Sequence, residues 1–367
     1  MDSDNEHSPS TGAAPGTDGA ARLRVDDAGT LIAALPAMLG FVPARSVIVA
    51  LLRAFGGSAG GREIRAVARF DLDAVTDPGT AQQMLGLLDS MFLREDAVAA
   101  LAVVVDDRAD ALTSARLVVE SLRRSTVGLG CAWLVPAITA GARYRGLLEA
   151  DGSGFVPDPS ASPVAFAQVL DGVAIRGSRD ELVELLAPDP VMIAAVEPHL
   201  GPAITRHREQ LAAAATDEHR HTHQRAATEA VLALITTINE TTPAPQDLAT
   251  VTAVLRDRTI RDIMFGLVGT PLADPAQPLW HQLARACSGP DRAEAAMLCG
   301  YDAYCRGAGV HAGICLEAAL RSDPSHPMAV LLHTALSEGI HPDRIRRIAE
   351  AGRQVATDLG IDLPPTT

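Results

Sequence analysis

Four aspartates that follow two predicted strands are the residues of this chain best suited to carry chemistry. They are Asp71, Asp73, Asp106 and Asp107. They come at the ends of the runs 62–71 and 97–105, and ligand sites in open α/β sheets lie beyond the carboxyl ends of the strands. If the two strands are parallel and adjacent, the carboxylates supply the hard oxygen ligands that Mg²⁺ prefers. Aspartate also ends strands as a solvated turn residue, so both interpretations stay open.

A pair of histidines is the second candidate metal site. His219 and His223 lie one helical turn apart in the polar segment 217–225, and this spacing lets two imidazoles grip a transition metal from one face of a helix. Asp217 is a conceivable third ligand. An exposed, polar helix start explains the same residues without a metal.

The sequence assigns no catalytic residue. Residues 56–60 match the letters G-x-S-x-G, but a nucleophile elbow leads into a helix, whereas a strand is predicted to follow here. Ser58 is therefore expected at a hairpin tip. All 31 basic residues are arginine, which excludes Schiff-base and pyridoxal-phosphate chemistry and a P-loop lysine. No cofactor is expected, except Mg²⁺ if the aspartates converge.

Composition limits the partners and the compartment. With a net charge of -14 the chain repels phosphate backbones and anionic lipid surfaces, so neither nucleic acid nor membrane is expected as a partner. Its five cysteines form no C-x-x-C pair and are expected to be reduced core thiols. The apolar runs fall short of the roughly 20 residues of a membrane helix. We expect a cytoplasmic protein.

The elements that must position the aspartates form an α/β or α+β domain with a mixed sheet. Strands at 46–54 and 62–71 have a short glycine-rich connection, which favours an antiparallel hairpin. The run 97–105 is apolar without alternation, which is typical of a central strand covered on both faces.

Almost everything after residue 162 is predicted to be helical. One long helix is expected at 247–268, followed by a proline-rich loop at 270–278. Small or helix-breaking residues near the C-terminus fall at tetratricopeptide-like spacings, in a partial match that indicates either a structural or a binding hairpin: Gly300, Ala312, Ala319 and Pro324. The expected organisation is a disordered tail (1–20), an α/β domain (21–150), a linker (151–162) and a helical domain with tetratricopeptide-like hairpins (163–367).

The chain resembles a family of uncharacterised bacterial proteins, the domain of unknown function family 4192. The residues that carry the resemblance in the first block are Leu35, Pro36, Leu39, Gly40, Phe41, Pro43, Ser46, Arg69 and Asp71. Two further blocks are 178–188 and a tail that begins with PLW at 278–280. The resemblance implies a shared fold, and it implies no activity, cofactor or catalytic residue. A cysteine-rich patch often found in the family has no counterpart in the stretch that begins at Tyr144.

Two functions follow as expectations. The first is a non-catalytic cytoplasmic protein that binds another protein through its C-terminal helices, because no nucleophile, base and orienting group assemble in the sequence. The alternative is a magnesium-dependent enzyme that acts on a phosphorylated small molecule or nucleotide, with the four aspartates as metal ligands.

Overall fold

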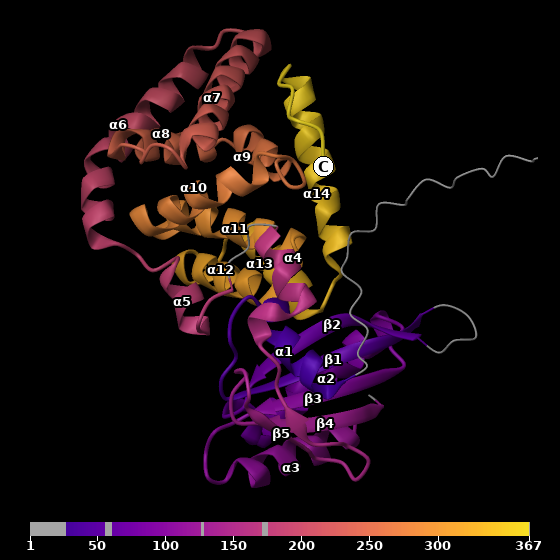
Figure 1. Ribbon diagram of the computed structural model, residues 1–367. Helices are drawn as coiled ribbons and strands as arrows, with labels where there is room; N and C mark the ends of the chain where they lie inside the picture. The colour runs from indigo at the N-terminus through magenta and orange to yellow at the C-terminus, as the bar shows by residue number, and fades with distance from the viewer. Residues whose placement is uncertain (1–26, 56–60, 126–127, 171–174, 367) are drawn as a thin grey trace, which may run out of the picture.

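A six-stranded mixed sheet forms the N-terminal half of the protein and helices form the rest (Figure 1). The computed structural model describes residues 27–55, 61–125, 128–170 and 175–366, so the expected tail at 1–20 and Ser58 lie outside the described residues. The strands are β1 (Ser46–Phe55), β2 (Gly61–Asp71), β3 (Ala99–Val105), β4 (Leu129–Val135), β5 (Arg143–Gly146) and β6 (Gly154–Phe155). Their order across the sheet is β2-β1-β3-β4-β5-β6.

Among the six strands that the structure describes, only β3 and β4 pair in parallel. The pairs β1–β2, β1–β3, β4–β5 and β5–β6 are antiparallel. The predicted antiparallel hairpin and the mixed sheet are thus confirmed. All seven residues of β3 are buried, as its unbroken apolar run predicts for a central strand.

Helices flank the sheet and build the C-terminal half. Those in the N-terminal half are α1 (Ala28–Leu39), α2 (Pro78–Arg94) and α3 (Ala111–Arg123), with short 3₁₀ turns at Ala74–Thr76 and Pro159–Ala161. The others are α4 (Pro163–Leu170), α5 (Arg179–Glu184), α6 (Pro190–Ala213), α7 (Asp217–Thr237), α8 (Pro245–Leu255), α9 (Arg258–Phe265), α10 (Ala273–Ala286), α11 (Gly289–Cys305), α12 (Gly309–Ser322), α13 (Pro327–Ser337) and α14 (Pro342–Asp358). No helix in the described part of the chain is long and apolar enough to cross a membrane.

Two hydrophobic cores lie on opposite faces of the sheet. On one face Val49 and Val104 pack with Leu88 of α2 and Val118 of α3. On the other face a larger core starts at α1 and the neighbouring strand residues and continues without interruption into the C-terminal helices. This core continues on both sides of residues 151–162, and the segment itself contributes β6 to the sheet. The expected domain boundary at this segment stays a prediction.

Two helical expectations differ from the structure. The segment 247–268 is not one helix but α8 and α9, because the Asp257 side chain accepts a hydrogen bond of 2.9 Å from the Thr259 amide and starts a new helix. The expected loop 270–278 instead contains the first part of α10, which continues through Pro278.

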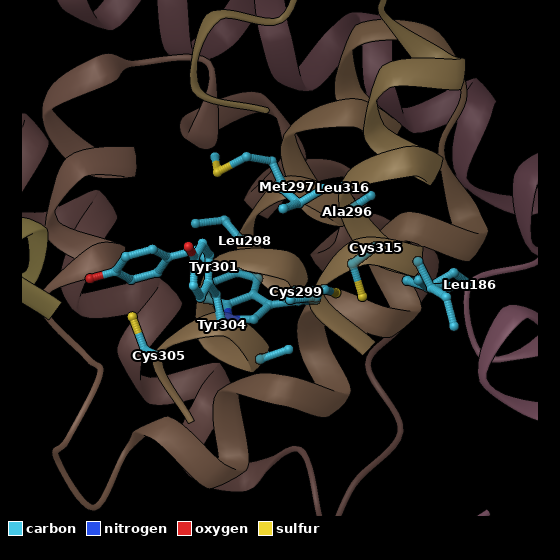
Figure 2. Packing of buried hydrophobic residues seen from close by; sticks show 14 of the residues in the cluster. Leu186, Ala296, Met297, Leu298, Cys299, Tyr301, Tyr304, Cys305, Cys315 and Leu316 are labelled. Atoms are coloured by element: carbon cyan, nitrogen blue, oxygen red, sulfur yellow. The ribbon is translucent and has the colours of Figure 1, made fainter. Parts of the chain in front are cut away.

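The consecutive helices α11 and α12 pack closely against each other within a buried hydrophobic cluster that includes Tyr301, Tyr304 and Leu316 (Figure 2). Gly300 permits this approach, because an added Cβ atom would lie 2.7 Å from Leu316 Cγ. Phe265 packs edge-on against Tyr301 with ring centroids 4.8 Å apart. The all-helical character of this half is confirmed, whereas its tetratricopeptide-like character is not.

Candidate functional site

The predicted strand-end aspartates lie at one edge of the sheet. Strands β2 and β3 both run antiparallel to β1, so they point the same way, and Ser46 of β1 lies opposite both Asp71 and Val105. Asp71, Asp73 and Asp106 therefore follow the same ends of their strands. The two strands are not adjacent, because β1 separates them.

Arginine side chains occupy the space between these carboxylates. Arg108 donates two hydrogen bonds of 2.8 Å to Asp106 and one of 3.1 Å to Asp73. Arg45 forms a second ion pair with Asp73. The hydrogen bond from Arg45 holds the pKa of Asp73 below its usual range, and that from Arg108 does the same for Asp106. Both carboxylates are thus stabilised as anions by guanidinium groups.

The other two aspartates form no ion pair with Arg45 or Arg108, although the Asp71 carboxylate accepts a hydrogen bond of 3.0 Å from the Asp73 amide. Asp71 lies 3.5 Å from the Nη2 atom of Arg69, whose Nε atom donates a hydrogen bond of 2.8 Å to the Ser46 hydroxyl. Asp107 is exposed. Among the described residues, no three or more His, Cys, Asp or Glu side chains are arranged to hold a metal ion. The magnesium site stays a prediction that nothing in this geometry favours.

Of the two histidines of α7 that were predicted to share a metal ion, His223 instead contacts a histidine of α6 through its imidazole. His223 Nε2 lies 3.0 Å from Nδ1 of His207 on α6, while His219 is exposed. Burial lowers the pKa of His207, and the nearby charge of His223 lowers it further. The two imidazoles therefore share one hydrogen bond between neighbouring helices.

A site that the sequence did not predict lies along β2, which is an edge strand. Its hydrogen-bonded partner in the sheet is β1. The Leu72 amide donates to the Arg45 carbonyl at 2.9 Å, and the regular alternation of an antiparallel ladder then turns the main-chain groups of Ala68 and Phe70 toward β1. The N–H and C=O groups of Val67 and Arg69 point away from it. These outward groups make no hydrogen bond to any described residue.

The free edge of β2 faces a cleft of about 750 Å³ whose lining includes residues 63–70. One wall comes from α2, through Leu87 and Met91. The other comes from α12 and from the turn that joins α13 to α14; it includes Gly309 and Gly313, which lie one helical turn apart and add no side chain to the cleft. In Figure 1 the edge of the sheet formed by β2 is the one that faces the C-terminal helices.

Charged groups in this cleft are incompletely paired. The pKa of Arg69 is lowered because burial penalises its charge; Asp71 offsets part of this effect, and the positive charge of Arg179 adds to it. At the β-bulge, Arg65 Nε is buried without a hydrogen-bond partner among the described residues, and the nearest carboxylate oxygen of Glu95 lies 3.8 Å away. Both arginines therefore have capacity for an additional acceptor or anion.

Sequence reasoning missed the cleft because no residue type marks it. The only signals were Arg69 and Ser46, two residues of the family resemblance that form a hydrogen bond beside the cleft. Nothing in the residues alone shows that β2 has a single neighbour in the sheet.

Comparison with known proteins assigns the chain to a family. The model of a family described as a domain of unknown function, DUF4192, matches residues 29–343. No curated protein and no solved structure matches the chain significantly. The matched segment includes the whole sheet and, of the cleft walls, α2, α12 and the turn before α14. The chain is therefore a member of the DUF4192 family.

Proposed function

We propose that this protein is a non-catalytic, cytoplasmic binding protein that holds an extended segment of a partner protein against the free edge of β2. The observation that carries the proposal is the unused row of main-chain donors and acceptors at Val67 and Arg69, which faces a cleft of about 750 Å³. In strand addition, main-chain hydrogen bonds supply affinity and the pockets beside the strand supply specificity.

The geometry of the walls fits an added strand. Helix α2 flanks one face of β2 and α12 with α14 flanks the other, so an incoming strand continues the sheet between them. Open sheet edges invite aggregation, and proteins manage them by covering them. Here the covering helices leave space beside the strand instead of filling it. In this arrangement the C-terminal helices contribute to partner binding as one wall of the cleft.

The charges of the cleft favour an acidic segment. Arg69 and Arg179 lie close enough to repel each other, and Asp71 and Glu317 neutralise them only in part, with shortest N–O separations of 3.5 and 3.6 Å. An aspartate or glutamate of the partner, opposite Arg69, would stabilise both guanidinium groups. A carbonyl oxygen of the same segment would satisfy Arg65 Nε. We therefore propose an extended, apolar partner segment that carries an acidic residue.

The magnesium-dependent enzyme has less support, because arginine side chains already neutralise Asp73 and Asp106. The cytoplasmic location is proposed because all five cysteines are free thiols, as is usual in a reducing compartment.

The proposal is tested with random peptides displayed on phage and selected on the full-length protein. Recovered peptides are synthesised, and their binding is measured by fluorescence anisotropy on wild type, Val67→Pro and Val67→Ala. Proline removes the outward N–H of residue 67 and is tolerated in edge strands. Alanine also removes most of the valine side chain but keeps the main-chain N–H, so it is the control.

We expect the selection to recover acidic peptides. Their affinity should fall about tenfold or more in Val67→Pro and less than about threefold in Val67→Ala. Arg179→Glu, a change at a partly exposed side chain, should also weaken them. Thermal unfolding checks that each variant is folded. Equal affinity for wild type and folded Val67→Pro, or a selection that recovers no binding peptide, contradicts the proposal.

A further inference from the structure

A second cavity, far from β2 in the sequence, lies among α6, α7 and α8. It has a volume of about 580 Å³, within the range of small-molecule sites in proteins. The wall from α7 consists mostly of small side chains, which leave the space open: Ala226, Ala227, Ala230 and Ala233. Val251 and Val254 of α8 complete an apolar floor.

Polar groups gather at one end of this groove. His207, Arg206 and Gln210 of α6 and His223 of α7 lie near the turn that joins the two helices. From His223 to Thr237 the lining extends about 21 Å along α7, since an α-helix rises about 1.5 Å per residue. The site is therefore elongated and mostly apolar along its length, with its basic groups at the His207 end; the other polar lining residues are Thr237, Asp247 and Thr250.

His207 is the buried polar group whose hydrogen bonding is incomplete. Its side chain belongs to a residue that is 8% exposed, and its Nδ1 atom shares a hydrogen bond with His223. Its Nε2 atom is buried without a partner among the described residues. A buried polar atom without a partner is energetically unfavourable, so a ligand that supplies the missing partner gains affinity.

Arg206 supplies the charge at the same end. It is exposed and makes no ion pair with any described residue. From these observations we infer that the α6–α8 groove binds an amphipathic carboxylate, with its apolar chain along the α7 alanines and its carboxylate between Arg206 and His207. This inference concerns a different region from the peptide cleft and does not depend on it.

Dodecanoate and dodecanol are suitable probes, because they share the apolar chain and differ in the anionic head group. Binding to the full-length protein is measured by titration calorimetry below the micelle-forming concentration. Dodecanoate is expected to bind one site and to bind more tightly than dodecanol. Arg206→Gln should weaken dodecanoate about two- to fivefold, the size expected of an exposed ion pair, and should leave dodecanol unchanged.

Ala230→Trp tests the location. Ala230 is exposed in the groove, so the indole fills the groove without displacing a core residue. Ala212 is exposed on α6 outside the groove, and Ala212→Trp is the matched control. We expect binding to be lost in the first variant and retained in the second. Equal binding to both variants, or no dodecanoate binding to the wild type, overturns the inference.

Discussion

The hydroxyl group of Tyr304 donates a hydrogen bond of 2.7 Å to the main-chain carbonyl of Ile340. Tyr304 lies at the end of α11 and Ile340 in the turn that leads into α14, and both line the cleft beside β2. The preceding Gly339 lies against α2, since an added Cβ would be 2.9 Å from Met91 Cγ. The bond thus fixes the point at which the two walls of the cleft meet.

The first prediction concerns this bond. Tyr304→Phe should lower the free energy of unfolding by about 1 kcal/mol, the net value of a typical hydrogen bond. Burial raises the pKa of Tyr304 to about 12 from its usual 10.0. Because the folded-state pKa is the higher one, the contribution of the phenol is complete below pH 10 and is lost as the pH rises toward 12.

Denaturant titrations of wild type and Tyr304→Phe at several pH values measure this difference. A difference in the free energy of unfolding between the two proteins that stays constant up to pH 10 supports this role of the hydroxyl group. A gap of zero at neutral pH would show that the hydroxyl does not secure the turn.

The second prediction concerns the arginine network at the sheet edge. Asp106→Asn should lower the free energy of unfolding by about 1–3 kcal/mol at neutral pH, because the buried carboxylate accepts two charged hydrogen bonds from Arg108. Asp107→Asn is the matched control, since Asp107 is exposed, and it should have no measurable effect.

The acid dependence follows from the lowered pKa of Asp106. A group with a lowered folded-state pKa stabilises the protein above its unfolded value of about 3.9, and this stabilisation is lost as the pH falls through the folded value. The gap between wild type and Asp106→Asn should therefore narrow below about pH 4. A gap that stays the same at every pH would contradict an ionic origin.

The third prediction concerns two helical glycines in opposite environments. At Gly352, where α14 crosses α9, an added Cβ would lie 2.4 Å from the Asp262 carbonyl oxygen, so Gly352→Ala should destabilise the protein by about 1–3 kcal/mol. At Gly86 in α2, which is exposed, an added Cβ meets nothing within 4 Å, and Gly86→Ala should stabilise the protein by about 0.4–1 kcal/mol. The midpoint temperatures of thermal unfolding of the two variants should shift in opposite directions. A shift in the same direction would contradict this packing.

The fourth prediction concerns the thiols. Cys131 is partly exposed, and the other four cysteines are buried. Burial raises the pKa of the Cys131 thiol as well as those of Cys287, Cys299 and Cys305, so access of the reagent, and not pKa, distinguishes Cys131. Iodoacetamide at pH 8 should therefore modify Cys131 first in the folded protein, and Cys131→Ser should abolish this first modification in mass spectra. Early labelling of any buried cysteine would mean that the α11–α12 core opens readily.

The sequence predicted those parts of the fold that depend on local patterns. The unbroken apolar run of β3 identified a central strand, and the glycine-rich connection identified the β1–β2 hairpin. The break at Asp257 was missed although its signal is local, because the apolar stripe of α8 continues across it into α9. Short strands such as β6, with two residues, carry too little pattern to be recognised.

The site depends on relations that local patterns do not contain. The sequence identified Asp71, Asp73 and Asp106 and correctly associated them with strand ends, but it did not show the three arginines that neutralise them. The cleft brings α2 together with the turn after α13, segments far apart in the chain. Its existence depends on the strand order, which is set by long-range packing. The histidine pair shows the same limit, because the partner of His223 lies on the preceding helix.

Hydrogen exchange of individual amides along β2 is the sharpest test of strand addition at this edge. In the free protein the Val67 and Arg69 amides should exchange rapidly, because they point away from β1, while those of Ala68 and Phe70 should be protected by the ladder. A peptide from the phage selection should slow exchange at Val67 and Arg69 and leave Ala68 unchanged. Full protection of Val67 and Arg69 without peptide, or no added protection with it, would contradict strand addition at this edge.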